Sequence, residues 1–225
     1  MLVHRHHPRY TRYCSFHDIF LWERTGSDQM IPGKLEHFKF AEALFQQFSI
    51  HGTTEKTCQW LPKTCFKNWI ERVGVNSHLG LLQITGKPDS GKSTLMKHML
   101  EITCVRFREN PGICTLSHFF DRSGQLLQHS PTGILRSLLY QLGTQYPTAL
   151  MAFQDYTQAD LKLLKSSDAK SYTDILKSSL EEIFSSSSLA PERTIIFVDA
   201  LDECDSSDAV SMGYVEIKEL VNLGG

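Results

Sequence analysis

The sequence predicts an α/β fold built around a parallel sheet, and two stretches of the chain carry this prediction. Residues 79–85 are mostly apolar and are followed by a glycine-rich turn and a helical pattern of apolar residues that runs to Phe107. Residues 194–198 are β-branched and apolar, which is typical of a strand buried on both faces of a parallel sheet. Strands that alternate with helices in this way form parallel α/β sheets.

The remaining elements follow from shorter patterns. Ser130 and Pro131 mark a helix start, because Ser is a preferred cap and Pro is tolerated at the first helical position. Apolar residues at helical spacing predict the helices. In chain order, the expected elements are a helix over 38–48, a strand over 113–120, a helix over 131–142, a helix over 172–184, a loop at 185–188 and a helix over 215–221.

The composition excludes several classes of protein. Of the 225 residues, 41% are hydrophobic and 21% are charged, as in ordinary globular domains. A net charge of −2 gives no electrostatic reason to expect a nucleic-acid partner. No apolar run reaches the roughly 18 residues that a bilayer requires, and the N-terminus lacks the apolar segment of a secretory signal. We therefore expect no nucleic-acid partner and no membrane partner.

The turn after the first strand matches the phosphate-binding pattern G-x-x-x-x-G-K-[ST]. Between a strand and a helix, the backbone N–H groups of such a turn converge on one place and carry partial positive charge. Lys92 is expected to reach the β- and γ-phosphates of a nucleotide, and the Ser93 hydroxyl to ligate Mg²⁺. Asp89 replaces a usual small residue, but Asp tolerates left-handed backbone and can turn outward. The expected nucleotide-binding residues are Gly86, Lys87, Pro88, Asp89, Ser90, Gly91, Lys92, Ser93 and Thr94.

The second strand ends in the acidic segment 199–205, with the sequence DALDECD. Open α/β sheets bind ligands beyond the carboxyl ends of their strands, so Asp199 is expected to hold Mg²⁺ together with Ser93. Asp202 and Glu203 follow in the turn, where either could orient or deprotonate an attacking water, and both are candidate catalytic residues. Taken alone, an acidic turn after a strand is more often a helix cap; the phosphate-binding pattern in the same chain favours a metal site.

A strand followed by DALDECD, downstream of GKPDSGKSTLMKHML, resembles the NACHT class of STAND P-loop NTPases. The similarity is closest to fungal proteins whose NTPase region is called the nephrocystin-3-like N-terminal domain, and it covers about residues 41–210. It implies ATP or GTP, with Mg²⁺, as the cofactors. An N-K-x-D guanine-reading motif is absent, which favours ATP. Further segments that resemble the family are residues 57–61, 66–70, 117–122 and 133–142.

On this resemblance the chain divides into a poorly ordered extension over residues 1–40, a short helical lead-in over 41–78 and a truncated P-loop NTPase domain over 79–225. In the family, a further strand follows the acidic turn, ends in an Arg that senses the γ-phosphate, and lies between the two motif strands. We therefore expect an incomplete P-loop NTPase core, with the two motif strands parallel and a slot left between them. Nucleotide hydrolysis is expected to be near background.

The resemblance implies a nucleotide-binding switch that controls a larger signalling protein through self-association or contacts with partner domains. The alternative is a degenerate interaction module that keeps the motifs without turnover, or a gene fragment that retains them. A small-molecule kinase is disfavoured, because no arginine-rich lid or acceptor site is evident. The six cysteines show no C-x-x-C pairing, which favours reduced thiols and a cytoplasmic location.

Overall fold

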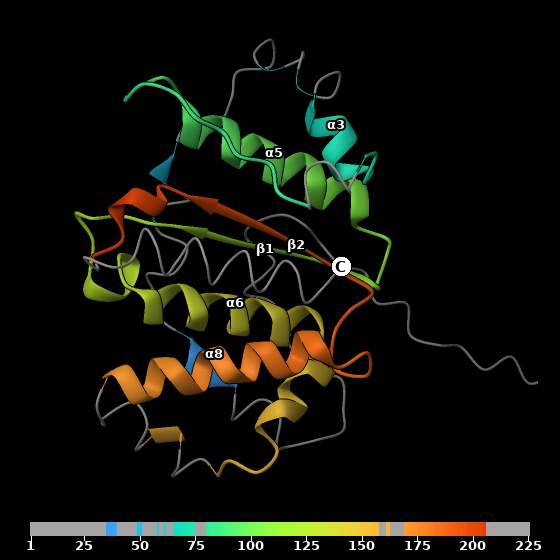
Figure 1. Cartoon of the computed structure of the whole chain (residues 1–225), viewed down its shortest axis with the longest axis vertical. Helices are drawn as coiled ribbons and strands as arrows, with labels where there is room; N and C mark the ends of the chain where they lie inside the picture. The colour runs from blue at the N-terminus through green and yellow to red at the C-terminus, as the bar shows by residue number, and fades with distance from the viewer. Residues whose placement is uncertain are drawn as a thin grey trace, which may run out of the picture.

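The described part of the chain is a parallel two-stranded sheet with helices on both faces (Figure 1). β1 (Ile113–Phe119) pairs with β2 (Arg193–Asp199) along its whole length. The α/β class and the parallel sheet predicted from the sequence are therefore confirmed. The structure is a computed structural model that describes residues 35–39, 49–50, 58, 61, 65–74, 80–157, 161–162 and 169–205.

The helices form separate layers on the two faces of the sheet. α5 (Lys92–Phe107) and the short α3 (Cys65–Ile70) lie on one side, and α6 (Pro131–Gln145) covers the other (Figure 1). α8 (Ala169–Ser185) packs against the outer side of α6. Short 3-10 turns lie in the connections, namely η4 (Leu126–Gln128), η5 (Pro147–Phe153) and η6 (Leu201–Glu203).

Each face of the sheet packs against its own hydrophobic cluster. Cys114 and Leu116 of β1 are fully buried among the leucines of α6 and α8. Ile195 and Phe197 of β2 are buried on the opposite face, against Met99 and Leu100 of α5. A strand that is covered on both faces is mostly apolar, and the run Ile195–Val198 of β2 shows this pattern.

The local helix signals are confirmed where the structure describes them. Ser130 caps α6, because its hydroxyl accepts a hydrogen bond of 3.2 Å from the Gly133 N–H, and Pro131 is the first helical residue. α5 and α8 also form where the apolar periodicity predicts helices. The predicted helix over 215–221 lies outside the described residues, as do most of the helix over 38–48 and most of the extension over 1–40.

The strand predicted over residues 79–85 is wrong in one respect: its described part, residues 80–85, belongs to no sheet. The side-chain alternation of a strand is present, since Leu82 and Ile84 are half-buried against the α5-side cluster while Gln83 and Thr85 are exposed. The hydrogen bonds of a strand are absent from this segment: in the described part of the chain, β2 pairs with β1 and with no residue of 80–85. An apolar sequence pattern predicts which side chains are buried. A β-strand also requires hydrogen bonds to an adjacent strand, which the pattern does not specify.

The outer edge of β1 is closed by two glutamines of α6. Gln141 accepts a hydrogen bond from the Ser117 N–H at 2.9 Å and donates one to the Ser117 carbonyl at 2.6 Å. Gln145 makes the same pair of contacts with Thr115, at 3.1 and 2.8 Å. Two residues of strand span about 6.6 Å and four residues of helix about 6 Å, so the glutamines match the strand repeat. Their amides take the place of a neighbouring strand.

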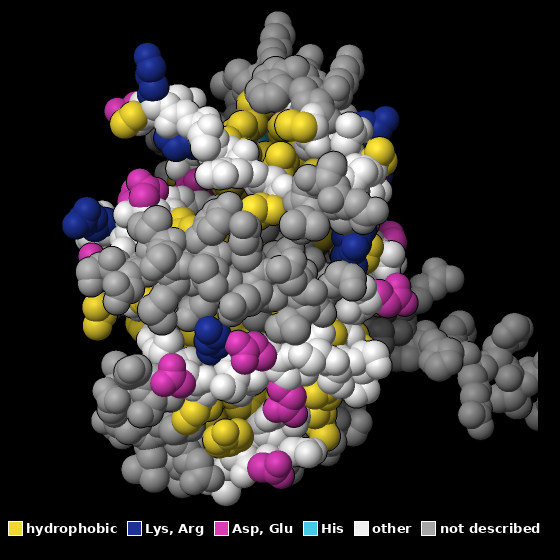
Figure 2. All heavy atoms as spheres, viewed as in Figure 1, with side chains coloured by type: hydrophobic (Ala, Val, Ile, Leu, Met, Phe, Trp, Pro, Cys, Tyr) yellow, Lys and Arg dark blue, Asp and Glu magenta, His cyan; other side chains and the backbone are white. Residues whose placement is uncertain are grey.

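The surface of the described residues carries mixed charge. Figure 2 shows basic side chains scattered singly over one face of the molecule rather than gathered into a stripe. Within the described ranges, none of the helices has the length and apolar character needed to cross a bilayer.

Candidate functional site

The glycine-rich turn over residues 86–91 is fully exposed and leads directly into α5. Gly91 precedes the helix with a left-handed backbone, φ +80°, and no side chain caps the helix start. The first N–H groups of a helix lack partners within the helix, so this end of α5 can receive an anion. Asp89 also has left-handed backbone, φ +58°, and its side chain is exposed, as the sequence suggested for an Asp at this position.

Lys92 ties the two ends of the turn together. Its ammonium donates hydrogen bonds to the carbonyls of Gly86, at 3.1 Å, and Lys87, at 2.9 Å. Both contacts are exposed, so the ammonium can exchange these carbonyls for a phosphate at little cost. A Cβ added at Gly86 would lie 2.8 Å from the Ser90 hydroxyl oxygen, so the Ser90 side chain would have to move.

The two sequence motifs meet at Ser93 and Asp199. Ser93, in the first turn of α5, donates a hydrogen bond to the carboxylate of Asp199, the last residue of β2. The Ala200 N–H donates a second hydrogen bond to the same carboxylate. The fold therefore brings together the hydroxyl and the carboxylate that the sequence separately suggested as metal ligands.

Asp199 is buried, and burial raises the pKa of its carboxyl group above the ordinary value. The hydrogen bonds from Ser93 and Ala200 and the nearby charge of Lys92 lower this pKa, whereas the charge of Glu203 raises it. Desolvation is the largest of these effects, so the charged carboxylate is held in an unfavourable place. A cation would relieve that cost.

The structure separates the two candidate catalytic residues. Glu203 lies close enough to Asp199 to affect its pKa, and it is half-buried. Asp202 is exposed and has no such influence on Asp199. The chain turns sharply between strand and acidic residues, because Ala200 has a left-handed backbone with φ +53°. Of the two, Glu203 is therefore the residue that faces the site.

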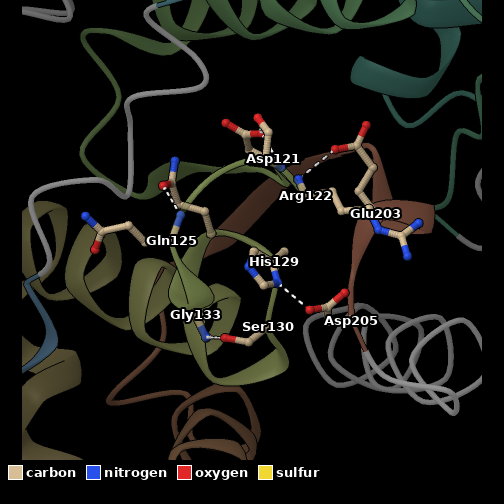
Figure 3. Close-up of polar contacts among 10 residues, drawn as sticks. Asp121, Arg122, Gln125, His129, Ser130, Gly133, Glu203 and Asp205 are labelled. Carbon is tan, nitrogen blue, oxygen red and sulfur yellow. Dashed lines mark hydrogen bonds and ion pairs between the residues drawn. The ribbon is translucent and has the colours of Figure 1, made fainter.

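Two contacts near the site were not expected from the sequence. Glu203 Oε2 accepts a hydrogen bond from the Arg122 N–H at 3.0 Å, and His129 Nδ1 lies 2.8 Å from Asp205 Oδ2 (Figure 3). Arg122 and His129 belong to the segment that follows β1, and Glu203 and Asp205 to the segment that follows β2. The only sequence signal for such a meeting is that neighbouring parallel strands end at the same edge of a sheet.

The donor set fits a magnesium nucleotide. An exposed turn with an uncapped helix start offers N–H groups to phosphate oxygens, and Lys92 supplies a mobile positive charge beside them. Ser93 and Asp199 offer a hydroxyl and a carboxylate oxygen side by side, the oxygen ligands that Mg²⁺ prefers.

We expect Asp199→Asn to make the nucleotide-free protein more stable at pH 7 and to weaken Mg²⁺-dependent nucleotide binding at least about tenfold. The amide oxygen can still accept hydrogen bonds from Ser93 and Ala200, but the buried charge is gone. Because folding raises the pKa of Asp199, its charge destabilises the fold in full above the raised pKa, and this cost disappears as the pH falls to the pKa of the unfolded chain. The advantage of Asn should therefore fade as the pH falls toward about 4.

Denaturant unfolding of both proteins between pH 4 and 8 measures this effect, and calorimetry with and without Mg²⁺ measures the binding. A stability difference that stays constant over the whole pH range would contradict the assignment of the effect to the buried carboxylate.

Comparison with known proteins gives one family. A family model described as nephrocystin 3, N-terminal, matches residues 56–221, which include the glycine-rich turn, both strands and the acidic segment. Comparisons with curated proteins and with solved structures give no match.

Proposed function

Because this chain belongs to the nephrocystin 3 N-terminal family, we propose that it is a nucleotide-binding module of a NACHT-type P-loop switch. The observation that supports this most directly is the hydrogen bond between Ser93 and Asp199. These residues lie in separate motifs, far apart in the sequence, and each is the metal-ligating position of its motif. A turn that matched the phosphate-binding pattern by chance would not need a buried carboxylate beside it.

The ligand that fits this site is ATP with Mg²⁺. ATP is preferred to GTP because the sequence lacks a guanine-reading motif, and GTP is the alternative. The metal ion supplies charge neutralisation at the β- and γ-phosphate oxygens. Lys92 leaves the Gly86 and Lys87 carbonyls to contact the same phosphates, and Ser93 and Asp199 provide the metal ligands. Glu203 is the residue placed to act on a water molecule near the γ-phosphate.

A non-hydrolysing interaction module is the second candidate, and one contact favours it. Glu203 accepts a hydrogen bond from the Arg122 N–H, so one oxygen of its carboxylate is already occupied. In either case the bound nucleotide would act by changing contacts with other copies or with partner domains of a larger protein. Phosphate release by the purified protein distinguishes the two candidates.

We expect Lys92→Ala to raise the Kd for ATP with Mg²⁺ by about 10- to 150-fold. This corresponds to losing a charge-assisted hydrogen bond to phosphate, worth roughly 1.5–3 kcal/mol. Isothermal titration calorimetry measures both affinities. Lys97→Ala is the matched control, because Lys97 lies in the same helix but donates its hydrogen bond to the Ile50 carbonyl. Equal affinities of the wild type and Lys92→Ala would rule out the phosphate site.

A further inference from the structure

The segments that follow β1 and β2 are joined by hydrogen bonds and a side-chain contact at the carboxyl edge of the sheet. Besides the contact of Glu203 with the Arg122 N–H, the Asp205 N–H donates a hydrogen bond of 2.7 Å to the His129 carbonyl. The side chains of His129 and Asp205 meet at 2.8 Å (Figure 3). We call these contacts among Arg122, His129, Glu203 and Asp205 the clasp.

The clasp holds the acidic segment at two residues, Glu203 and Asp205. Its outer end, Asp205, is bound by backbone and side chain to His129. Its inner contact uses the carboxylate of Glu203, which also lies near the carboxylate of Asp199. The two carboxylates repel each other, and the hydrogen bond from the Arg122 N–H stabilises the Glu203 carboxylate in its position within the clasp.

We propose that the clasp holds Glu203 in an inactive position and opens when a magnesium nucleotide binds next to Asp199. The proposal rests on the proposed function of this site and names its regulation. His129 and Asp205 are then positioning residues, since they act on Glu203 through the acidic segment.

The physical reason for opening is that a bound cation would offset the negative charge of Asp199. Without a metal ion, Glu203 faces the negative charge of Asp199 and is better placed at the Arg122 N–H. A divalent cation held at Asp199 would offset the charge of that carboxylate and so remove the repulsion that favours Glu203 at the Arg122 N–H. Glu203 would then move toward the nucleotide, and the Arg122 N–H would lose its acceptor. Among the described residues, Glu203 is the one hydrogen-bond acceptor of the Arg122 N–H.

The first test follows the Arg122 amide by hydrogen exchange, measured by NMR on the full chain with and without Mg²⁺ and a non-hydrolysable ATP analogue. We expect slow exchange in the free protein and exchange at least about tenfold faster in the complex. Glu203→Ala should give fast exchange in both states. Unchanged protection of the Arg122 amide in a complex shown by calorimetry to be saturated would overturn the proposal while leaving nucleotide binding intact.

The second test weakens the clasp at its exposed end. Asp205→Ala removes the side-chain contact with His129, and Asp205 is 46% exposed, so the fold should tolerate the change. We expect phosphate release to rise at least about threefold above the wild type, and adding Glu203→Gln to remove the gain. Asp174→Ala, an exposed residue of α8, is the matched control and should leave turnover unchanged.

Two results would overturn the proposal in different ways. Turnover by Asp205→Ala at or below the wild-type level, with unchanged nucleotide affinity, would show that the clasp supports Glu203 or is irrelevant to it. Absence of nucleotide binding by the wild type would overturn the clasp proposal together with the proposed function, and calorimetry separates this result from the first.

Discussion

Gly133→Ala should destabilise the protein by on the order of 3 kcal/mol or more and lower its yield as a folded chain. Gly133 lies in the first turn of α6, where the backbone of η4 crosses the helix. An added Cβ would lie 1.6 Å from the Leu127 carbonyl oxygen, far inside contact distance, and the obstacle is backbone rather than the end of a flexible side chain. Either α6 or η4 must therefore move.

The measurement is chemical denaturation followed by circular dichroism. Gly112→Ala is the matched control, because an added Cβ there meets only the flexible side chain of Glu192, at 2.8 Å. It should cost less than about 1 kcal/mol. Because η4 lies in the same segment as Arg122 and His129, a Gly133→Ala protein that does fold should also have a faster-exchanging Arg122 amide. Equal stability of the two variants would show that the segment after β1 is not packed against α6 as the structure has it.

Stability should also fall steeply in mild acid because of His118. This side chain is 1% exposed on β1, edge-on to the Phe120 ring, and neither ring nitrogen has a hydrogen-bond partner within the described part of the chain. Burial lowers the pKa of His118 from 6.5 to about 3. Since the unfolded chain takes up this proton and the folded chain does not, the fold is unaffected above pH 6.5 and loses stability below it. The expected slope is about 1.4 kcal/mol per pH unit.

His118→Leu removes the titrating group and should flatten the curve, by about 2.3 kcal/mol between pH 6.5 and 4.5. Urea unfolding at several pH values gives the slope for each protein. His98→Leu, a partly exposed position on α5, is the control and should keep the wild-type slope. If His118→Leu loses stability with acid as steeply as the wild type, then His118 is not buried as a neutral imidazole.

The sequence predicted the elements whose signals are local. The Ser130–Pro131 start of α6 needs only neighbouring residues, and the two apolar strands need only to be covered on both faces. Residues 80–85 show the limit of this reasoning. Their apolar character predicted a buried strand, and Leu82 and Ile84 are indeed half-buried, but pairing depends on a neighbouring strand that no local pattern specifies.

The site was predictable to a similar depth. The motif spacing predicted Lys92, Ser93 and Asp199 as ligand positions, and the structure places Ser93 and Lys92 near the carboxyl group of Asp199. That these residues bind a ligand stays a prediction. The choice between Asp202 and Glu203 was not predictable, since neighbouring residues of a 3-10 turn point about 120° apart and only the fold decides which one faces Asp199. The clasp was invisible for another reason: two of its three contacts use the backbone groups of Arg122 and His129, which every residue but Pro can offer.

The glutamines of α6 have a consequence for how copies of this domain can associate. An assembly that elongates by adding strands needs two free edges on every molecule, one to join the growing end and one to become the next growing end. Gln141 and Gln145 occupy one of these edges in each copy. Two copies could pair through their other sheet edges, those of β2. A third copy could not add a strand to this pair, because the outer edge of β1 in each copy is already occupied by glutamines of α6. Strand addition between copies of this domain would therefore give dimers rather than fibres.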